Sequence, residues 1–320
     1  MFEKKVYSSY LVKGQLKSAI AYLENFEEMS EKVLKYKSTF EGHQLIKRSD
    51  NQRLNEIDAI FQEYYRMVFW EEKSEAECES YLLKAIGTYL NITSTEEEAS
   101  LSRPEKMEGL EKKLAALVEK EGYYYLGGTT GSWYGPYIWK DTEKVVYSVE
   151  LPKGTFELTV NMLTGFVSRS WLDYLSFGAT GTGGWATDTE LYCVKELYEE
   201  DMDAPSFQIS YLKHEAQHKL DMQVNPNMDG VSLEYRAKLV ELIYYPNLDK
   251  FSFFLLEASD ENKTNSHAYS SFLIGRELSK RILGKELERD MDAWKGKEEE
   301  IKQEAMKLYF ESSAEKTVLE

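Results

Sequence analysis

The sequence predicts an α+β fold in which helices, then a sheet, and then helices again follow one another along the chain. Apolar residues recur at helical spacings between about residues 13 and 118, strand-like alternation is concentrated between residues 122 and 194, and helical spacing returns from about residue 206. Such segregation favours α+β over an alternating parallel sheet. We therefore expect an N-terminal helical region at residues 1–120 and a second domain at residues 121–320.

The first third of the chain is expected to form several amphipathic helices. Apolar stripes at spacings of three and four indicate three of them, and Ser102 and Glu105 are expected to form a capping box at the start of the last one. Long charged helices of this kind are typical of a scaffold or of a surface for a protein partner. The stripes consist of Leu54, Ile57, Phe61, Tyr64 and Val68, then Leu82, Ile86 and Tyr89, and then Met107, Leu110, Leu114 and Leu117.

The middle of the chain is expected to form the sheet. Residues 145–149 (VVYSV) read as a strand, and apolar side chains alternate at Phe156, Leu158, Val160 and Met162 as in a half-buried strand. Glycine-rich pieces between these segments are typical of turns.

Composition and charge limit the classes of function. The formal net charge of −17 argues against binding to nucleic acid or to anionic membranes. The two cysteines, Cys78 and Cys193, are too few for a disulfide framework or a cysteine metal site. The first residues lack the apolar run of a signal peptide, and no run approaches the roughly 20 apolar residues of a membrane span. These features predict a soluble, cytoplasmic protein.

The most informative motif is His214-Glu215-Ala216-Gln217-His218, an H-E-x-x-H sequence. Residues four apart on a helix lie one turn above the other, so both imidazoles can reach one ion, and Glu215 between them can act as a base on metal-activated water. With four histidines in 320 residues, the number of such matches expected by chance is on the order of 0.005. The motif therefore predicts a Zn²⁺ site.

The phase of this helix supports the prediction. Ile209, Leu212, Ala216 and Leu220 fall on one side, which is expected to pack on the core. At about 100° per residue, both histidines lie nearly opposite that stripe, so they are expected to point away from the core.

A catalytic zinc site needs a third protein ligand, and Glu234 is the first candidate. A short turn and a second helix follow the motif, with Ser232 as its expected cap and Pro246 after its end, so Glu234 can pass the metal. Glu241 lies at a similar angle and could accept a hydrogen bond from a ligand imidazole. The other possible oxygen ligands are Asp221 and Asp229.

His214-Glu215-x-x-His218 followed by a helix that carries Glu234 resembles the gluzincin branch of zincin metallopeptidases. The resemblance implies a twisted sheet beside the metal helix, with an edge strand that binds an extended peptide; Gly183, Gly184 and Trp185 are the candidates for this edge. It also implies a His or Tyr that stabilises the oxyanion, for which His267 and then Tyr269 are the candidates, with Tyr211 and Tyr235 in reserve. The chain departs from thermolysin-like enzymes at Lys238, where an acidic residue is expected.

The motif and the resemblance together predict a zinc-dependent metallopeptidase that acts on peptide or protein substrates, with His214, His218 and Glu234 on the metal and Glu215 as general base. The alternative is a non-catalytic zinc-binding interaction protein that retains the H-E-x-x-H site. A third interpretation is a helical adaptor without metal.

Overall fold

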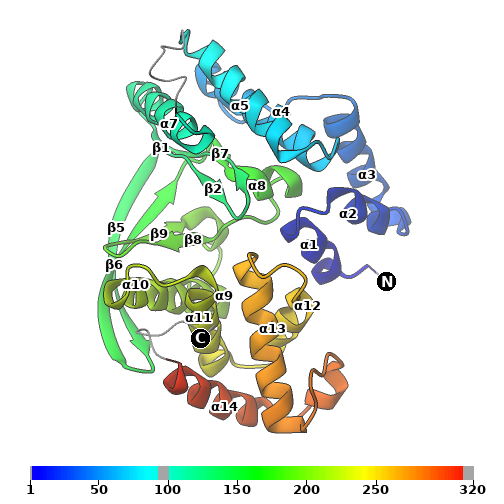
Figure 1. Cartoon of the computed structure of the whole chain (residues 1–320), viewed down its shortest axis with the longest axis vertical. Coiled ribbons are helices and arrows are strands. Elements are labelled where there is room, and N and C mark those ends of the chain that lie inside the picture. Colours follow the sequence, from blue (N-terminus) through cyan, green and yellow to red (C-terminus); the bar gives the residue numbers. More distant parts are fainter. Residues whose placement is uncertain (1, 93–100, 313–320) are drawn as a thin grey trace. The chain divides into compact units, whose positions relative to one another are not determined.

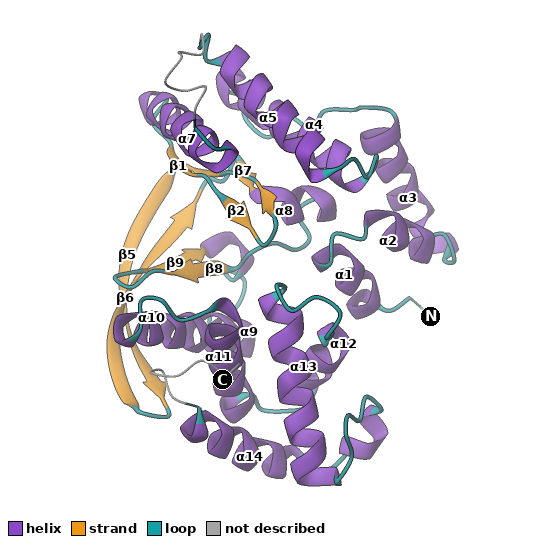
Figure 2. Cartoon of the chain, viewed as in Figure 1, coloured by secondary structure: helices purple, strands orange, loops and turns teal. Residues whose placement is uncertain are grey.

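The computed structural model describes residues 2–92 and 101–312, and these residues form a mixed α+β fold (Figure 1). Helices make up most of it, and the strands are confined to the middle of the chain (Figure 2). The expected order of helices, sheet and helices is therefore confirmed at the level of the α+β class. No helix within the described residues is both long enough and apolar enough to cross a membrane.

The chain divides into two compact units, each of which takes in two segments. Residues 1–141 and 164–182 form the first unit, and residues 142–163 and 183–320 form the second. This division does not follow the boundary expected after residue 120. The reason is that β1 (Tyr124–Leu126) packs on the preceding helix, and Ile138 and Trp171 share a hydrophobic core with the N-terminal helices.

The first unit is built mainly from helices that bury the apolar stripes expected from the sequence. Leu54, Ile57 and Phe61 are fully buried in its core, and the Ser102–Glu105 capping box is present. A three-stranded sheet, in the order β1-β4-β7, and a small β2-β3 hairpin complete the unit. Its other elements are α1 (Lys4–Val12), α2 (Leu16–Leu23), α3 (Ser30–Tyr36), α4 (Gln52–Phe69), α5 (Glu75–Tyr89), α7 (Arg103–Lys120), β2 (Thr129–Thr130), β3 (Trp133–Tyr134), β4 (Tyr137–Trp139), β7 (Ser168–Arg169) and α8 (Ser170–Ser176).

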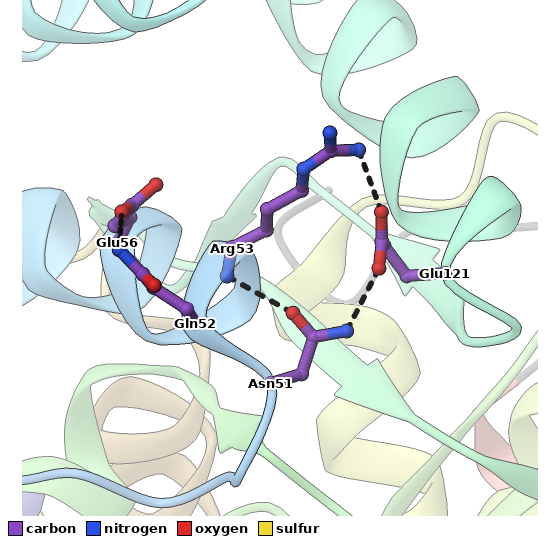
Figure 3. Close-up of a pocket in the computed structure, with 5 residues that line it drawn as sticks. All are labelled: Asn51, Gln52, Arg53, Glu56 and Glu121. Carbon is purple, nitrogen blue, oxygen red and sulfur yellow. Dashed lines mark hydrogen bonds and ion pairs between the residues drawn. The ribbon is translucent and has the colours of Figure 1, made fainter.

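A surface pocket of the first unit lies at the start of α4 (Figure 3). Asn51 caps this helix by accepting a hydrogen bond from the Arg53 amide, and its Nδ2 donates to Glu121 Oε2 at 2.9 Å. Arg53 Nη1 also lies 2.8 Å from Glu121 Oε1. Because these polar groups pair with one another, the pocket is explained by helix capping. It is lined by Asn51, Gln52, Arg53, Glu56 and Glu121.

The second unit contains a four-stranded sheet in the order β5-β6-β9-β8. The strands β5 (Asp141–Leu151) and β6 (Gly154–Thr164) include both strands expected from the sequence. β6 runs parallel to β9 (Leu191–Val194), and β8 (Gly184–Ala186) runs antiparallel to β9. This order places β8 at one end of the sheet.

Helices cover the face of this sheet that carries Val160, Met162 and Cys193, and the two layers share one hydrophobic core. The core contains Phe207 and Leu212 from the segment that leads into the metal motif, and Ala216 from the motif itself. The helices are α9 (Pro205–Phe207), α10 (His214–Val224), α11 (Gly230–Tyr244), α12 (Asp249–Glu257), α13 (Ser266–Leu278) and α14 (Glu298–Glu311).

Candidate metal centre

The candidate site is built on the neighbouring helices α10 and α11. A π-helical segment at Gln208–Lys213 leads directly into α10, and wider turns of this kind are frequent at functional sites. Helix α10 is tied to the sheet side at both ends, because Lys213 Nζ donates to Glu150 O at 2.5 Å and Gln223 Nε2 donates to Asp188 O at 2.9 Å. The first residue of the metal motif therefore sits on a helix whose position is fixed.

Helix α11 begins three residues earlier than the sequence suggested. We expected Ser232 to cap it, but the helix starts at Gly230, and Asp229 is the cap. The Asp229 carboxylate accepts from the Ser232 amide at 2.9 Å and from the Ser232 hydroxyl at 2.6 Å. The earlier start is explained by the aspartate, which caps a helix as well as serine does. Helix α11 ends at Tyr244, shortly before Pro246.

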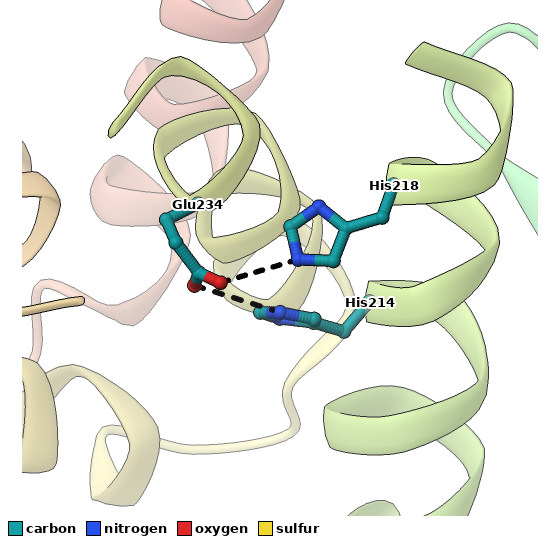
Figure 4. A group of neighbouring side chains, drawn as sticks. All are labelled: His214, His218 and Glu234. Carbon is teal, nitrogen blue, oxygen red and sulfur yellow. Dashed lines mark ion pairs between the residues drawn. The ribbon is translucent and has the colours of Figure 1, made fainter. Parts of the chain in front are cut away.

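His214, His218 and Glu234 converge between the two helices (Figure 4). One ligand atom from each residue lies within 4.8 Å of the other two. Nε2 of His218 is 3.3 Å from Glu234 Oε1, and Nε2 of His214 is 3.6 Å from Glu234 Oε2. Among residues 2–92 and 101–312 this is the one group of three or more such side chains with metal-binding spacing.

The two separations, one to each Glu234 oxygen, are longer than those of a simple ion pair and close to the spacing of ligands around zinc. Four ligands at tetrahedral angles around an ion with bonds of about 2.0–2.1 Å lie about 3.3–3.4 Å apart. A charge-assisted hydrogen bond would bring nitrogen and oxygen to about 2.7–2.9 Å. In addition, His218 Nδ1 and Glu234 Oε2 are buried and make no well-formed hydrogen bond with the described residues. Two imidazoles and a carboxylate, with a fourth position left for water, are the donor set of catalytic zinc sites.

The histidines do not point away from the core as the helix phase suggested. His214 is buried, and the His218 side chain is only 12% exposed. Helix α10 packs against β8 and β9 on one side and against α11 on the other. The apolar stripe therefore covers the sheet, while the opposite side is buried by a second helix instead of meeting solvent.

Glu241 takes the supporting position that the sequence suggested for it. Its Oε1 lies 2.8 Å from His214 Nδ1, and its Oε2 lies 2.6 Å from Lys250 Nζ. Burial alone would raise the pKa of Glu241, but Lys250 and His214 outweigh burial and lower this pKa to about 2. An ionised Glu241 accepts the Nδ1 proton of His214, which leaves Nε2 of that ring free to bind a metal.

Glu215 lies next to the candidate metal ligands but is not part of their group. No hydrogen bond or ion pair joins it to another described side chain, and the charges of His218, His214 and Glu234 act on its pKa. Burial raises the pKa of Glu215, and the two motif histidines partly oppose this shift. A carboxyl with a raised pKa suits proton transfer near neutral pH.

The structure brings His267 to the centre but not Tyr269. His267 is the second residue of α13, and its Nδ1 lies 3.0 Å from Glu234 Oε2. Glu234 raises the pKa of His267. Tyr269 lies about 200° further around the same helix, where it is buried and stacks on Phe272. Three of the four histidines of the chain therefore have a ring nitrogen within 3.6 Å of a Glu234 carboxylate oxygen.

The alternative oxygen ligands have other partners, whereas the reserve tyrosines are buried in the core. Asp221 Oδ2 accepts from Arg236 Nε at 2.7 Å, and Asp229 caps α11. Tyr211 stacks on Phe207, and its buried hydroxyl makes no well-formed hydrogen bond with the described residues. Tyr235 is buried in the same hydrophobic core.

The candidate edge segment lies beside α10. Strand β8 contacts this helix, and Trp185 stacks on Tyr192 of β9 with ring centroids 5.3 Å apart. Glycine at 183 and 184 has a packing reason, because a Cβ at Gly184 would lie 2.2 Å from the Tyr211 ring and one at Gly183 would lie 1.8 Å from the Tyr198 hydroxyl. The two glycines therefore let β8 approach the segment that leads into the metal motif.

Sequence reasoning missed Lys250, and it noted Lys238 only as a departure from thermolysin-like enzymes. Lys250 pairs with Glu241, and Lys238 is buried one turn after Glu234, where it pairs with Glu257. No spacing rule marks these residues, because their partners come from other helices.

Comparisons with models of protein families, with curated proteins and with solved structures give no match to this chain.

Proposed function

We propose that this protein is a zinc-dependent hydrolase that cleaves peptide bonds. The observation that carries the proposal is the convergence of two imidazoles and one carboxylate, held by α10 and α11 with one donor atom of each within 4.8 Å of the other two. Two imidazoles and a carboxylate form a donor set of catalytic zinc sites. Zinc bound by His214, His218 and Glu234 would act as a Lewis acid and lower the pKa of a coordinated water.

The residues of the chain supply the remaining chemistry. Glu215 accepts the proton of the attacking water and later donates it to the leaving amine, which its raised pKa favours. Glu241 and Lys250 keep His214 in the tautomer that binds metal. His267 is close enough to Glu234 to share the site, and its side chain is 58% exposed, so a substrate oxygen can reach the ring.

A peptide is the proposed substrate because of the position of β8. This strand ends the sheet and contacts the helix that carries the metal motif. An extended peptide that pairs with such a strand would have its backbone fixed beside the metal. The same arrangement of metal helix, downstream Glu234 and neighbouring edge strand is what the resemblance to gluzincins implies.

Metal analysis combined with a cleavage assay tests the proposal. We expect the purified protein to hold one zinc ion and to cleave members of a peptide library, and we expect a chelator to abolish this cleavage. Glu215→Gln should keep its zinc but lose about 10²–10⁴-fold in turnover, the usual contribution of a general base. Glu199→Gln, an exposed position outside the site, is the control and should keep full activity.

The outcomes separate the proposal from its rival. Cleavage retained by Glu215→Gln would remove Glu215 from the reaction. Zinc binding without cleavage of any library member would instead support the non-catalytic zinc-binding protein. Absence of zinc binding at low micromolar metal would overturn both.

A further inference from the structure

We propose that Lys238 is a positioning residue that holds His267 in the metal centre, so that it controls turnover without touching metal or substrate. The inference rests on the proposed function, since it concerns how one residue of that site is held. Lys238 is a buried cation close to the candidate metal ligands. It has no part in binding zinc or in the proposed role of Glu215.

Lys238 is buried, and its ammonium group is fully used. Its Nζ donates to Glu257 Oε2 at 2.6 Å, to Ser271 Oγ at 2.7 Å and to the backbone oxygen of His267 at 2.7 Å. Ser271 Oγ also donates to Glu257 Oε2 at 2.8 Å. An ammonium has three donors, and all three find an acceptor here.

The acceptors join three helices at one point. Lys238 belongs to α11, Glu257 is the last residue of α12, and His267 and Ser271 are in the first two turns of α13. The lysine therefore fixes the start of α13 against the helix that carries Glu234. A hydrogen bond from the Ser259 amide to Ala268 O also ties the α12–α13 connection to this turn.

His267 is held against α11 at two points that lie one helical turn apart. Its backbone oxygen is bound by Lys238, and its Nδ1 lies 3.0 Å from Glu234, four residues earlier on the same helix. When both ring nitrogens carry a proton, Nδ1 can pair with Glu234 while the other ring nitrogen donates to a substrate oxygen. Small displacements of such a group cost turnover steeply, so an anchor of its backbone affects the reaction.

A simple Lys238 replacement does not test this idea, because it would leave Glu257 buried without its cation and destabilise the protein strongly. The better variant is the double replacement Lys238→Met/Glu257→Gln, which removes both charges and keeps the side-chain lengths. Ser279→Ala is the matched control. It deletes the two hydrogen bonds of a buried hydroxyl just after α13, one donated to Gly275 O and one accepted from the Glu288 amide, without touching His267.

The kinetic arm is a double-mutant cycle with His267→Ala, measured on a peptide that the wild type cleaves. We expect Lys238→Met/Glu257→Gln to lower kcat at least 10-fold with its zinc content unchanged. The same change should have less than a twofold effect in the His267→Ala background, because Lys238 acts through His267. A full loss that persists without His267, or a similar loss in Ser279→Ala, would overturn the positioning role.

The second arm does not depend on activity. In the zinc-free protein, NMR of the histidine rings should show altered ring-nitrogen shifts for His267 in Lys238→Met/Glu257→Gln and unaltered shifts in Ser279→Ala. Unchanged His267 signals in the double variant would overturn the inference. Altered signals in a protein that cleaves no peptide would support the anchor and count against the proposed function alone.

Discussion

Each compact unit contains a buried cluster of carboxylates, and the two clusters differ in the partners that face them. In the first unit, Asp173 is paired with both Arg48 and Arg169, and Asp58 accepts a hydrogen bond from Gln62 at 2.7 Å. In the second unit, the ion-pair partners of Glu234 among the described residues are all imidazoles. An arginine has five donors, no acceptor and a permanent charge, so it pairs with carboxylates but cannot bind a metal. A neutral imidazole nitrogen can instead offer its lone pair to a metal.

The difference teaches how to tell scaffold from site among buried charges. Asp58 and Asp173 are surrounded by amide and guanidinium donors, which leave no lone pairs grouped around a common point. Glu234 and the motif histidines do group their lone pairs, because one donor atom of each lies within 4.8 Å of the other two. The first cluster therefore predicts effects on stability, and the second predicts effects on metal binding.

Glu234→Ala gives the sharpest test of this distinction. If structural zinc sites bind with about 10–16 kcal/mol from four ligands, one ligand contributes roughly 2.5–4 kcal/mol, or about 100- to 1000-fold in affinity. We expect a loss of that size, measured by competition with a chromophoric chelator. Asp58→Asn, which also removes a buried carboxylate, should keep the zinc affinity of the wild type. Equal affinities in both variants would break the comparison.

Asp58→Asn should instead change how stability depends on pH. Burial raises the pKa of Asp58 to about 6, although Arg48 opposes the shift. Since the folded protein then holds this proton more tightly than the unfolded chain, Asp58 favours folding below about pH 4, and this contribution disappears as pH rises through 6. A shift of about two units corresponds to roughly 3 kcal/mol.

Chemical denaturation of wild type and Asp58→Asn between pH 4 and pH 7 measures this effect. The free energy of unfolding of the variant, relative to wild type, should rise by roughly 3 kcal/mol across that interval. Other groups titrate equally in both proteins, so their contributions cancel in the difference. If the difference in free energy of unfolding between the two proteins did not change with pH, Asp58 would be ionised throughout this range. The Asp58 cluster would then be charged, as the surroundings of Glu234 are.

The sequence predicted the parts of the site that depend on local spacing. Two histidines four residues apart share one face of a helix, and a short turn brings the next helix back alongside it. The proximity of His214, His218 and Glu234 could therefore be predicted from the sequence. Glu241 followed from its angle on the same helix. Strand β5 was predicted from a run rich in β-branched residues, and β6 was predicted because its apolar residues alternate.

The remaining features depend on contacts between distant segments and left no local pattern. Lys250 and Lys238 meet their partners only after α12 and α13 have packed on α11. The burial of the motif histidines could not be predicted because a helical stripe identifies one packed face, while α10 is covered on two. The boundary of the first unit was missed because residues 164–182 return to it from later in the chain.

Glu241→Ala should weaken zinc binding less than Glu234→Ala does. It leaves His214 Nδ1 without its acceptor at 2.8 Å, and residues in this supporting role typically contribute 10- to 100-fold in metal affinity. The same chelator competition measures the loss, and Glu241→Gln should recover part of it because an amide oxygen still accepts the Nδ1 proton. An effect as large as that of Glu234→Ala would mean that Glu241 is itself a ligand. In that case an ion pair with a lysine, such as the one at 2.6 Å between Glu241 and Lys250, would no longer show that a carboxylate supports a ligand instead of binding the metal itself.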